Sequence, residues 1–118
     1  MANQDVGRDG ENLAVEYLSA HGFEIVERNW RCIAGEVDII ARDGTTGVIA
    51  MVEVKTRRGL LAGHPFEAIT AKKLARMNAV GVHWREQAGL HERVQLDVIG
   101  IILRGAGPAE IEHLRDIS

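Results

Sequence analysis

The sequence has little cysteine and no long apolar run, and both absences limit what the protein can be. A single cysteine, Cys32, stands among 118 residues, so the chain has neither an internal disulfide nor a thiolate cluster for zinc. The longest apolar stretch, VIGIILRG at residues 98–105, is far shorter than the roughly 18 residues that a membrane-spanning helix needs. We therefore expect a reduced, cytoplasmic protein with no membrane partner, and the polar, acidic start of the chain predicts no signal peptide.

Histidine spacing likewise predicts no zinc site. The chain has five histidines, but no two of them lie four residues apart and none has a cysteine neighbour. No repeat, low-complexity tract or linker divides the sequence. With 118 residues, 46% of them hydrophobic, the chain is predicted to form one domain, residues 1–118, around a modest core.

The net charge is acidic, but the charges are unevenly distributed. Lys and Arg number 14 against 17 Asp and Glu, a net charge of −3, which counts against a nucleic-acid partner. Residues 1–27 contain one basic and six acidic residues, whereas residues 55–76 contain six basic residues and one acidic residue. The second segment could form a local basic patch, although a solvated helix face is the simpler explanation.

Hydrophobic periodicity predicts an α/β fold with elements in the order α-β-β-β-α-β, followed by a possible edge strand. Helices are expected at residues 9–20 and 71–88, strands at 23–30, 36–42, 48–55 and 94–103, and the edge strand at 109–114. Thr70 is a candidate N-cap for the second helix, and the segment from Pro65 is a helical lead-in. This order suggests a mixed sheet flanked by helices.

The second predicted helix carries one stripe of small and apolar residues. Leu74, Met77, Gly81, Trp84 and Ala88 follow each other at helical spacing. Glycine lowers helix propensity, so its presence on the stripe indicates close packing against the sheet.

Three charged residues lie in two otherwise apolar strands. Asp38 belongs to the strand at 36–42, and Glu53 and Lys55 belong to the strand at 48–55. Burying a charge costs several kcal/mol unless the charge is paired or bound to a metal. These charges therefore need a partner.

The length of the turn between these two strands decides which residues face each other. If residues 44–47 form a four-residue turn, Asp38 stands directly opposite Glu53, with Cβ atoms about 4.5 to 5.5 Å apart. A turn of three or five residues would place Asp38 opposite Val52 or Val54 instead. Two opposed carboxylates repel each other, so the four-residue register requires something that neutralises them.

A divalent cation would remove this repulsion. Mg²⁺ takes oxygen ligands and keeps several waters, so Asp38, Glu53 and the backbone carbonyl of Val54 would suffice. Lys55 could then orient a water or stabilise negative charge, as hydrolysis of a phosphodiester requires. The simpler alternative is an ion pair between Lys55 and one of the carboxylates, because a motif this short also occurs by chance.

Five blocks of the sequence resemble a known family. GRDGENLAVEYLSAHGF, ERNWRCIAGEVDIIARDG, MVEVKTRR, GHPFEAITAKK and QLDVIGI resemble, in this order and spacing, the YraN-like family of small, largely uncharacterised bacterial proteins. That family is assigned to the PD-(D/E)XK, or restriction-endonuclease-like, superfamily. The resemblance covers nearly the whole chain and implies a restriction-endonuclease-like mixed β-sheet flanked by helices.

The resemblance also implies roles for individual residues. Asp38 and Glu53 would be ligands of Mg²⁺ or Mn²⁺, Lys55 would be the catalytic lysine of the E-x-K pair, and Glu11 would make a further metal or water contact. The alternative for Glu11 is a favourable interaction with a helix N-terminus.

Phosphate contacts are expected from the basic segment and its polar neighbour. The candidate nucleic-acid-binding residues are Thr56, Arg57, Arg58, Lys72, Lys73 and Arg76. Leu74 stands where many relatives would have Gln, so that turn is assigned no direct catalytic role.

Three functions remain open at this point. The first is a metal-dependent nuclease for DNA processing or repair, resolvase-like, which the complete triad favours. The second is a non-catalytic module that binds nucleic acid or protein, which the acidic total charge and small size favour. The third is a purely structural, ion-paired sheet. A homodimer is possible, because enzymes that cut two strands are commonly dimers.

Overall fold

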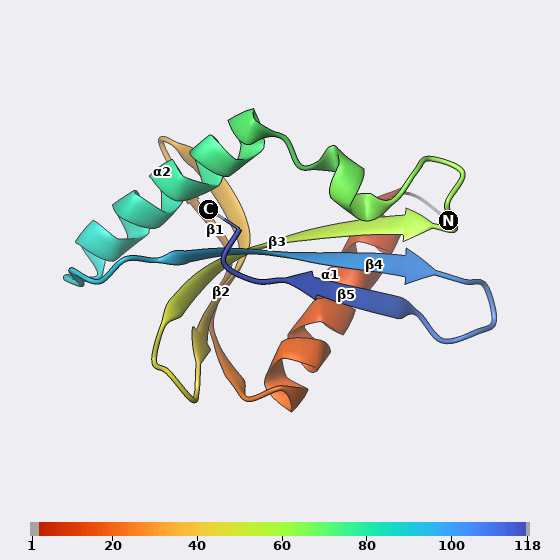
Figure 1. Cartoon of the computed structure of the whole chain (residues 1–118), viewed down its shortest axis with the longest axis horizontal. Coiled ribbons are helices and arrows are strands. Elements are labelled where there is room, and N and C mark those ends of the chain that lie inside the picture. Colours follow the sequence, from red (N-terminus) through yellow and green to blue (C-terminus); the bar gives the residue numbers. More distant parts are fainter. Residues whose placement is uncertain (1–2, 118) are drawn as a thin grey trace.

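The computed structural model describes residues 3–117, with side chains described from Asp9 onward. The described strands form one sheet in the order β1-β2-β3-β4-β5 (Figure 1). The strands are β1 (Phe23–Cys32), β2 (Gly35–Asp43), β3 (Ile49–Arg58), β4 (Gln95–Leu103) and β5 (Glu110–Leu114). The helices are α1 (Asn3–Ala20), α2 (Ala71–Gln87) and the short 3₁₀ helix η1 (Pro65–Ala68). None of the described helices is long and apolar enough to cross a membrane.

The sheet is mixed, with one parallel pair. β3 and β4 run parallel and are connected through η1 and α2, whereas every other neighbouring pair is antiparallel. The predicted order α-β-β-β-α-β is therefore confirmed, and the possible edge strand is β5, which pairs with β4. A mixed sheet flanked by helices is the architecture that the sequence predicted.

The two long helices cover opposite faces of the sheet (Figure 1). The α1 face has a core built around Leu18, Ile39 and Ile99, and the α2 face has one built around Ile40 and Met51. Since strand side chains alternate between faces, strands β1 to β4 contribute to both cores, whereas β5 contributes Ile111 to the α1-face core.

The face that α2 buries differs slightly from the predicted stripe. Met77, Val80, Gly81 and Trp84 are buried, whereas Ala88 is exposed and caps the C-terminus of the helix. Gly81 allows close packing as expected. A Cβ atom there would lie 2.6 Å from a methyl carbon of Val94 and 3.1 Å from Met51 Cγ.

The two helices also differ in how well their starts were predicted. Thr70 is the N-cap of α2, and its side chain accepts a hydrogen bond from the backbone N–H of Lys73 at 3.1 Å. α1 begins at Asn3 and not near residue 9. Glu11 consequently lies inside the helix, so the expected interaction of its carboxylate with a helix N-terminus does not hold.

The hairpin between β2 and β3 has the four-residue register. Asp43 N donates to Val48 O at 2.9 Å, and the ladder runs on to the pair Ile39–Val52. Pairing between β2 and β3 stops there, whereas β3 continues beside β4 as far as Arg58. A fork therefore opens between β2 and β3 immediately beyond Val52.

Candidate active site

The predicted carboxylates meet at this fork. Asp38 and Glu53 are the next opposed positions after Ile39–Val52. Asp38 Oδ2 accepts a hydrogen bond from Val54 N at 2.8 Å, which satisfies a backbone donor that the β2 ladder no longer reaches. In an extended strand, the N–H and C=O of one residue point to the same side. The carbonyl of Val54 consequently faces the fork as well.

The electrostatics of the fork disfavour two negative charges. Burial, followed by repulsion from Glu53, raises the pKa of Asp38 to about 7, and the Glu11 carboxylate adds a smaller repulsion. The Val54 N–H acts in the opposite direction but does not cancel these effects. No cation contacts the Asp38 carboxylate in the part of the chain that the structure describes. The Asp38 carboxyl group is therefore half-buried and has no neutralising partner among the described residues.

Glu53 does have a cation partner, and it comes from a helix. Lys73 Nζ lies 2.9 Å from Glu53 Oε2. Lys73 belongs to the first turn of α2, while Glu53 is a buried residue of β3 with 8% of its surface exposed. The alternative of an ion pair between Lys55 and a carboxylate is not what the structure has, because the cation that contacts Glu53 is Lys73.

Lys55 lies two residues beyond Glu53 on β3, so both side chains project from the same face. It is half-buried beside its β4 neighbour Gly100, over which the ring of Phe66 packs. A Cβ atom at Gly100 would lie 2.8 Å from a ring carbon of Phe66. Among the described residues, the Lys55 ammonium makes no hydrogen bond or ion pair.

Glu11 is near the fork but is held by other residues. Its carboxylate accepts hydrogen bonds from Arg28 at 3.0 and 3.2 Å and from Asn29 Nδ2 at 3.1 Å. Its negative charge reaches Asp38, as the pKa of that group shows. The geometry thus gives Glu11 an electrostatic effect on the fork, while its Oε1 atom is engaged by Arg28 and Asn29.

The donor set at the fork is suitable for a hard divalent cation. Among the described residues, no three His, Cys, Asp or Glu side chains gather as a metal-binding group. Two carboxylates and one backbone carbonyl are nevertheless all oxygen donors, and Mg²⁺ commonly uses few protein ligands and several waters. The residues present therefore fit Mg²⁺ or Mn²⁺ better than zinc, which prefers histidine and cysteine.

The polar residues that follow Lys55 on β3 divide between the two faces of the sheet. Arg57 lies on the face of Glu53 and Lys55, and its Nε atom is buried without a hydrogen-bond partner in the described part of the chain. Thr56 lies under α1, where a Cβ atom on Gly10 would come within 1.9 Å of its Oγ1. The structure thus places Thr56 on the opposite face of β3 from Lys55 and Arg57. Arg58 is exposed at the end of the strand.

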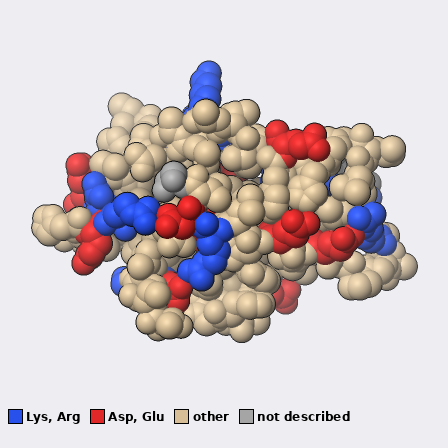
Figure 2. All heavy atoms as spheres, viewed as in Figure 1, with Lys and Arg blue, Asp and Glu red and all other residues tan. Residues whose placement is uncertain are grey.

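The basic residues of α2 lie beside the fork. Lys72 and Arg76 are exposed in its first two turns. The side chain of Arg76 runs along Gly35 at the start of β2, where an added Cβ atom would lie 3.1 Å from Arg76 Cδ. Figure 2 shows acidic side chains interspersed with basic ones on the face that it views, so positive charge there is broken up.

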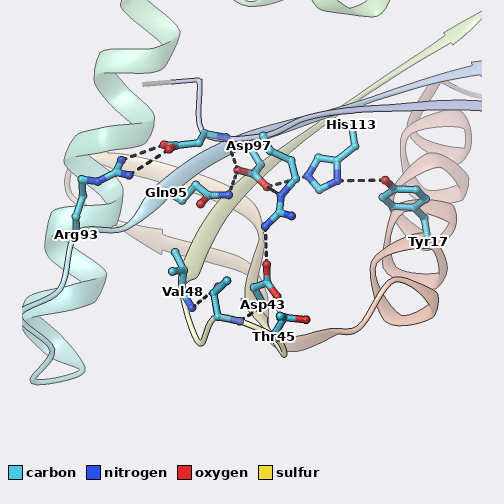
Figure 3. Close-up of polar contacts among 11 residues, drawn as sticks. Tyr17, Asp43, Thr45, Val48, Arg93, Gln95, Asp97 and His113 are labelled. Atoms are coloured by element: carbon cyan, nitrogen blue, oxygen red, sulfur yellow. Dashed lines mark hydrogen bonds and ion pairs between the residues drawn. The ribbon is translucent and has the colours of Figure 1, made fainter.

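A second polar cluster lies on the α1 face around Asp97, an acidic residue inside an otherwise apolar strand. Asp97 is fully buried and accepts hydrogen bonds from Gln95 Nε2 at 2.9 Å and Asp116 N at 3.0 Å. His113 Nε2 lies 2.7 Å from its other oxygen, and His113 Nδ1 lies 3.3 Å from the Tyr17 hydroxyl (Figure 3). The cluster fastens β5 to β4 and α1.

Arg115 extends this cluster to the β2–β3 turn. Its guanidinium donates to Asp43 at 2.6 Å and lies over the Phe23 ring, 5.0 Å from the centroid. The hydrogen bond from Arg115, followed by that from Thr45 N, holds the pKa of Asp43 below its usual range. The only signal in the sequence was the acidic Asp97 inside an apolar strand, because its partners other than Gln95 lie on β5 or just after it.

Comparison with known proteins gives close relatives and distant structural neighbours. A UPF0102 protein from Beutenbergia cavernae is 46% identical over 117 residues, covering 98% of each chain. A UPF0102 protein from Paenarthrobacter aurescens is 48% identical over 113 residues, covering 95% of this chain and 92% of that one. The solved structure of Hjc, a Holliday junction resolvase from Archaeoglobus fulgidus, covers 89% of this chain and 74% of its own with 17% identity and a TM-score of 0.48. Residues 10–101 match the family described as "Uncharacterised protein family UPF0102", and the chain belongs to this family.

Proposed function

We propose that the protein is a metal-dependent nuclease that hydrolyses phosphodiester bonds in DNA at the fork between β2 and β3. The observation that carries the proposal is the pair of opposed carboxylates, Asp38 and Glu53, with the pKa of Asp38 raised to about 7. A protein gains no stability from such an arrangement, and strongly perturbed acids cluster at functional sites. A divalent cation is the partner that would make both carboxylates favourable.

Each residue of the fork has a chemical role in this proposal. Asp38, Glu53 and the Val54 carbonyl hold Mg²⁺ or Mn²⁺. When bound, the metal supplies Lewis-acid stabilisation and makes a bound water more acidic. Lys55, whose ammonium is uncommitted among the described residues, orients the attacking water or stabilises negative charge developing on the phosphate. Glu11 adds negative charge that favours a cation at the fork.

The proposed nucleic-acid path runs from the end of β3 to the start of α2. Arg57 and Arg58 follow Lys55 along the strand, and Lys72 and Arg76 project from the first turns of the helix. Contacts of this kind with phosphates supply most of the affinity for DNA and are independent of sequence. Thr56, which packs under α1, takes part only through its backbone in this arrangement.

A second candidate function is a non-catalytic module that binds nucleic acid or protein with the same fold. The net charge of −3 and the mixed charges on the surface favour it, because DNA-binding enzymes usually present a continuous basic surface. In that case, the fork would bind a metal for stability or binding without turnover. Cutting both strands of a duplex would in addition call for a homodimer.

The experiment that tests the proposal is cleavage of end-labelled DNA in Mg²⁺ or Mn²⁺, with EDTA as the blank. Single-stranded, duplex, flap and four-way-junction substrates are compared, and an RNA of the same sequence is included. Wild type is assayed beside Lys55→Ala and Lys72→Ala, which remove the same charge from the fork and from the exposed helix surface. We expect cleavage by wild type, a loss of about 10²-fold or more in Lys55→Ala, and a change of only a few-fold in Lys72→Ala.

The alternatives give different results in the same assay. Equal activity of wild type and Lys55→Ala would remove Lys55 from the mechanism. Metal binding that depends on Asp38, without cleavage of any substrate, would favour the binding module. If neither metal binding nor cleavage occurs, the fork is only a structural feature of the sheet.

A further inference from the structure

The contact between Lys73 and Glu53 places a cation where the proposed metal would bind. Lys73 Nζ lies 2.9 Å from Glu53 Oε2, and the two side chains are 33% and 11% exposed. We propose that Lys73 is an internal competitor for the metal: its ammonium holds Glu53 in the metal-free protein and is displaced when a divalent cation binds. This inference rests on the metal site of the proposed function and adds a regulating residue to it.

The position of Lys73 is not explained by the stability of α2. Lys72 and Lys73 both stand in the first turn of the helix, which contains no acidic residue. The helix dipole disfavours cations at this end. The backbone N–H of Lys73 is already capped by Thr70, so the helix needs nothing from the lysine side chain. Glu53 is the group that compensates for the unfavourable placement.

The geometry also allows the ammonium to leave. Lysine carries its charge on a flexible stem of four carbons, and Lys73 is one-third exposed, so the ammonium can regain water after a small rotation. A partly exposed ion pair of this kind is weak. A divalent cation interacts with both Asp38 and Glu53, whereas Lys73 contacts only Glu53. The metal therefore displaces the lysine, but part of its binding free energy is lost in doing so.

Displacement gives Lys73 a second position. Once released, its ammonium remains tethered beside the fork, where the phosphate of a nucleic acid would lie. A phosphate that draws Lys73 away from Glu53 leaves that carboxylate available for the metal. By thermodynamic linkage, metal and nucleic acid then strengthen each other's binding.

The test is the affinity for Mn²⁺, measured by calorimetry at constant ionic strength on the full chain. Lys73→Met removes the charge while keeping an unbranched side chain, Lys72→Met removes the same charge one residue away, and Lys73→Arg keeps a cation beside Glu53. We expect Lys73→Met to bind Mn²⁺ about fivefold more tightly than wild type. Lys72→Met should change the affinity by less than about twofold, and Lys73→Arg should remain close to wild type.

Several outcomes would overturn the inference. Equal or weaker Mn²⁺ binding by Lys73→Met would show that the lysine does not compete. Equal tightening in Lys72→Met would reduce the effect to overall charge. Asp38→Asn identifies the site: if wild type binds Mn²⁺ and Asp38→Asn does not, the proposed metal site stands whatever Lys73→Met does. If neither wild type nor Lys73→Met binds Mn²⁺, while both melt cooperatively, the metal site itself fails.

A second measurement, the affinity for DNA, should change in the opposite direction to the affinity for Mn²⁺. Binding of labelled DNA is measured in Ca²⁺, which occupies oxygen sites, with the substrate that wild type binds most tightly. Lys73→Met should bind this DNA about threefold more weakly, because one phosphate contact is lost. Tighter metal binding together with weaker DNA binding is not expected from a merely structural lysine. Unchanged DNA binding would contradict the second position of the ammonium.

Discussion

Each face of the sheet buries carboxylate side chains, but the carboxylates on the two faces have different hydrogen-bond and charge partners. On the α1 face, Asp97 accepts hydrogen bonds from Gln95 and Asp116, lies 2.7 Å from His113, and is completely enclosed. At the fork, Asp38 has one backbone donor and the negative charge of Glu53 beside it. One cluster is satisfied by its own chain, and the other is not.

This difference separates a structural cluster from a functional one. Buried polar groups in stable proteins normally find partners, and the α1-face cluster does so while joining β5 and the β2–β3 turn to the rest of the fold. The fork keeps two acids together at a cost in stability. Such a cost persists where a bound partner compensates for it, which is why the fork is the better candidate for chemistry.

The largest expected effect comes from breaking the satisfied cluster. Asp97→Ala leaves the donors of Gln95, His113 and Asp116 without their acceptor in a buried environment. We expect the free energy of unfolding to fall by about 3 to 5 kcal/mol, measured by urea denaturation. Lys72→Met is the surface control and should change it by less than about 0.5 kcal/mol. If Asp97→Ala is as stable as wild type, the cluster does not fasten β5.

Neutralising Asp38 at the fork should instead raise the free energy of unfolding. Asp38→Asn keeps an oxygen that can accept the Val54 N–H but removes the repulsion with Glu53. In metal-free buffer at pH 8, we expect the free energy of unfolding to rise by about 1 to 2 kcal/mol. Thermal melting in EDTA measures this change. A lower melting temperature for Asp38→Asn would contradict the repulsion between the two carboxylates.

The pH dependence of stability should distinguish the two kinds of carboxylate. The pKa of Asp38 is about 7 in the folded protein but about 4 in the unfolded chain, so its contribution favours folding below pH 4 and is lost as pH rises to 7. Wild type and Asp38→Asn should therefore melt together near pH 4 and diverge up to pH 7. A constant difference across this range would show that the pKa of Asp38 is not raised.

Asp43 should change the pH dependence of stability in the opposite direction to Asp38. Its pKa is lowered by Arg115 in the folded protein, so its contribution favours folding above the unfolded pKa of about 4 and is lost as pH falls through the folded value. Arg115→Met should reduce this acid-side loss, because the hydrogen bond from Thr45 N remains, while leaving the behaviour between pH 4 and 7 unchanged. Melting curves of wild type and Arg115→Met from pH 3 to 8 test this prediction.

The smallest expected effect on stability comes from Tyr17, at the edge of the cluster around Asp97. Tyr17→Phe removes the hydroxyl that lies 3.3 Å from His113 Nδ1. We expect a loss of about 0.5 to 1 kcal/mol in the free energy of unfolding, because the contact is long and only partly buried. A loss as large as that of Asp97→Ala would mean that Tyr17, and not Asp97, holds His113 in place.

Much of the fold could be read from local patterns. The element order, the N-cap at Thr70 and the close packing at Gly81 all follow from residues near each other in the sequence, and the structure confirms them. The start of α1 was missed because its first turns are polar and glycine-containing and show no hydrophobic periodicity. Strand alternation alone would have separated Thr56 from Lys55 and Arg57, since neighbouring residues of β3 face opposite sides.

The contacts that join distant elements could not be found in this way. His113 reaches Asp97 only because β5 pairs with β4 in one register. Lys73 reaches Glu53 only because α2 crosses back over the sheet. Neither contact leaves a periodic signal in the sequence, and the sequence alone suggested Lys55 as the lysine that could pair with a carboxylate.

The sequence by itself predicted that Asp38 and Glu53 oppose each other if the turn has four residues, because the two-residue period of a strand is a local property. The structure has that turn length. Tertiary structure decided which cation meets them. The position of α2 over the fork depends on how Met77, Gly81 and Trp84 pack on the sheet, and that packing brings Lys73 to Glu53 while leaving Lys55 uncommitted among the described residues.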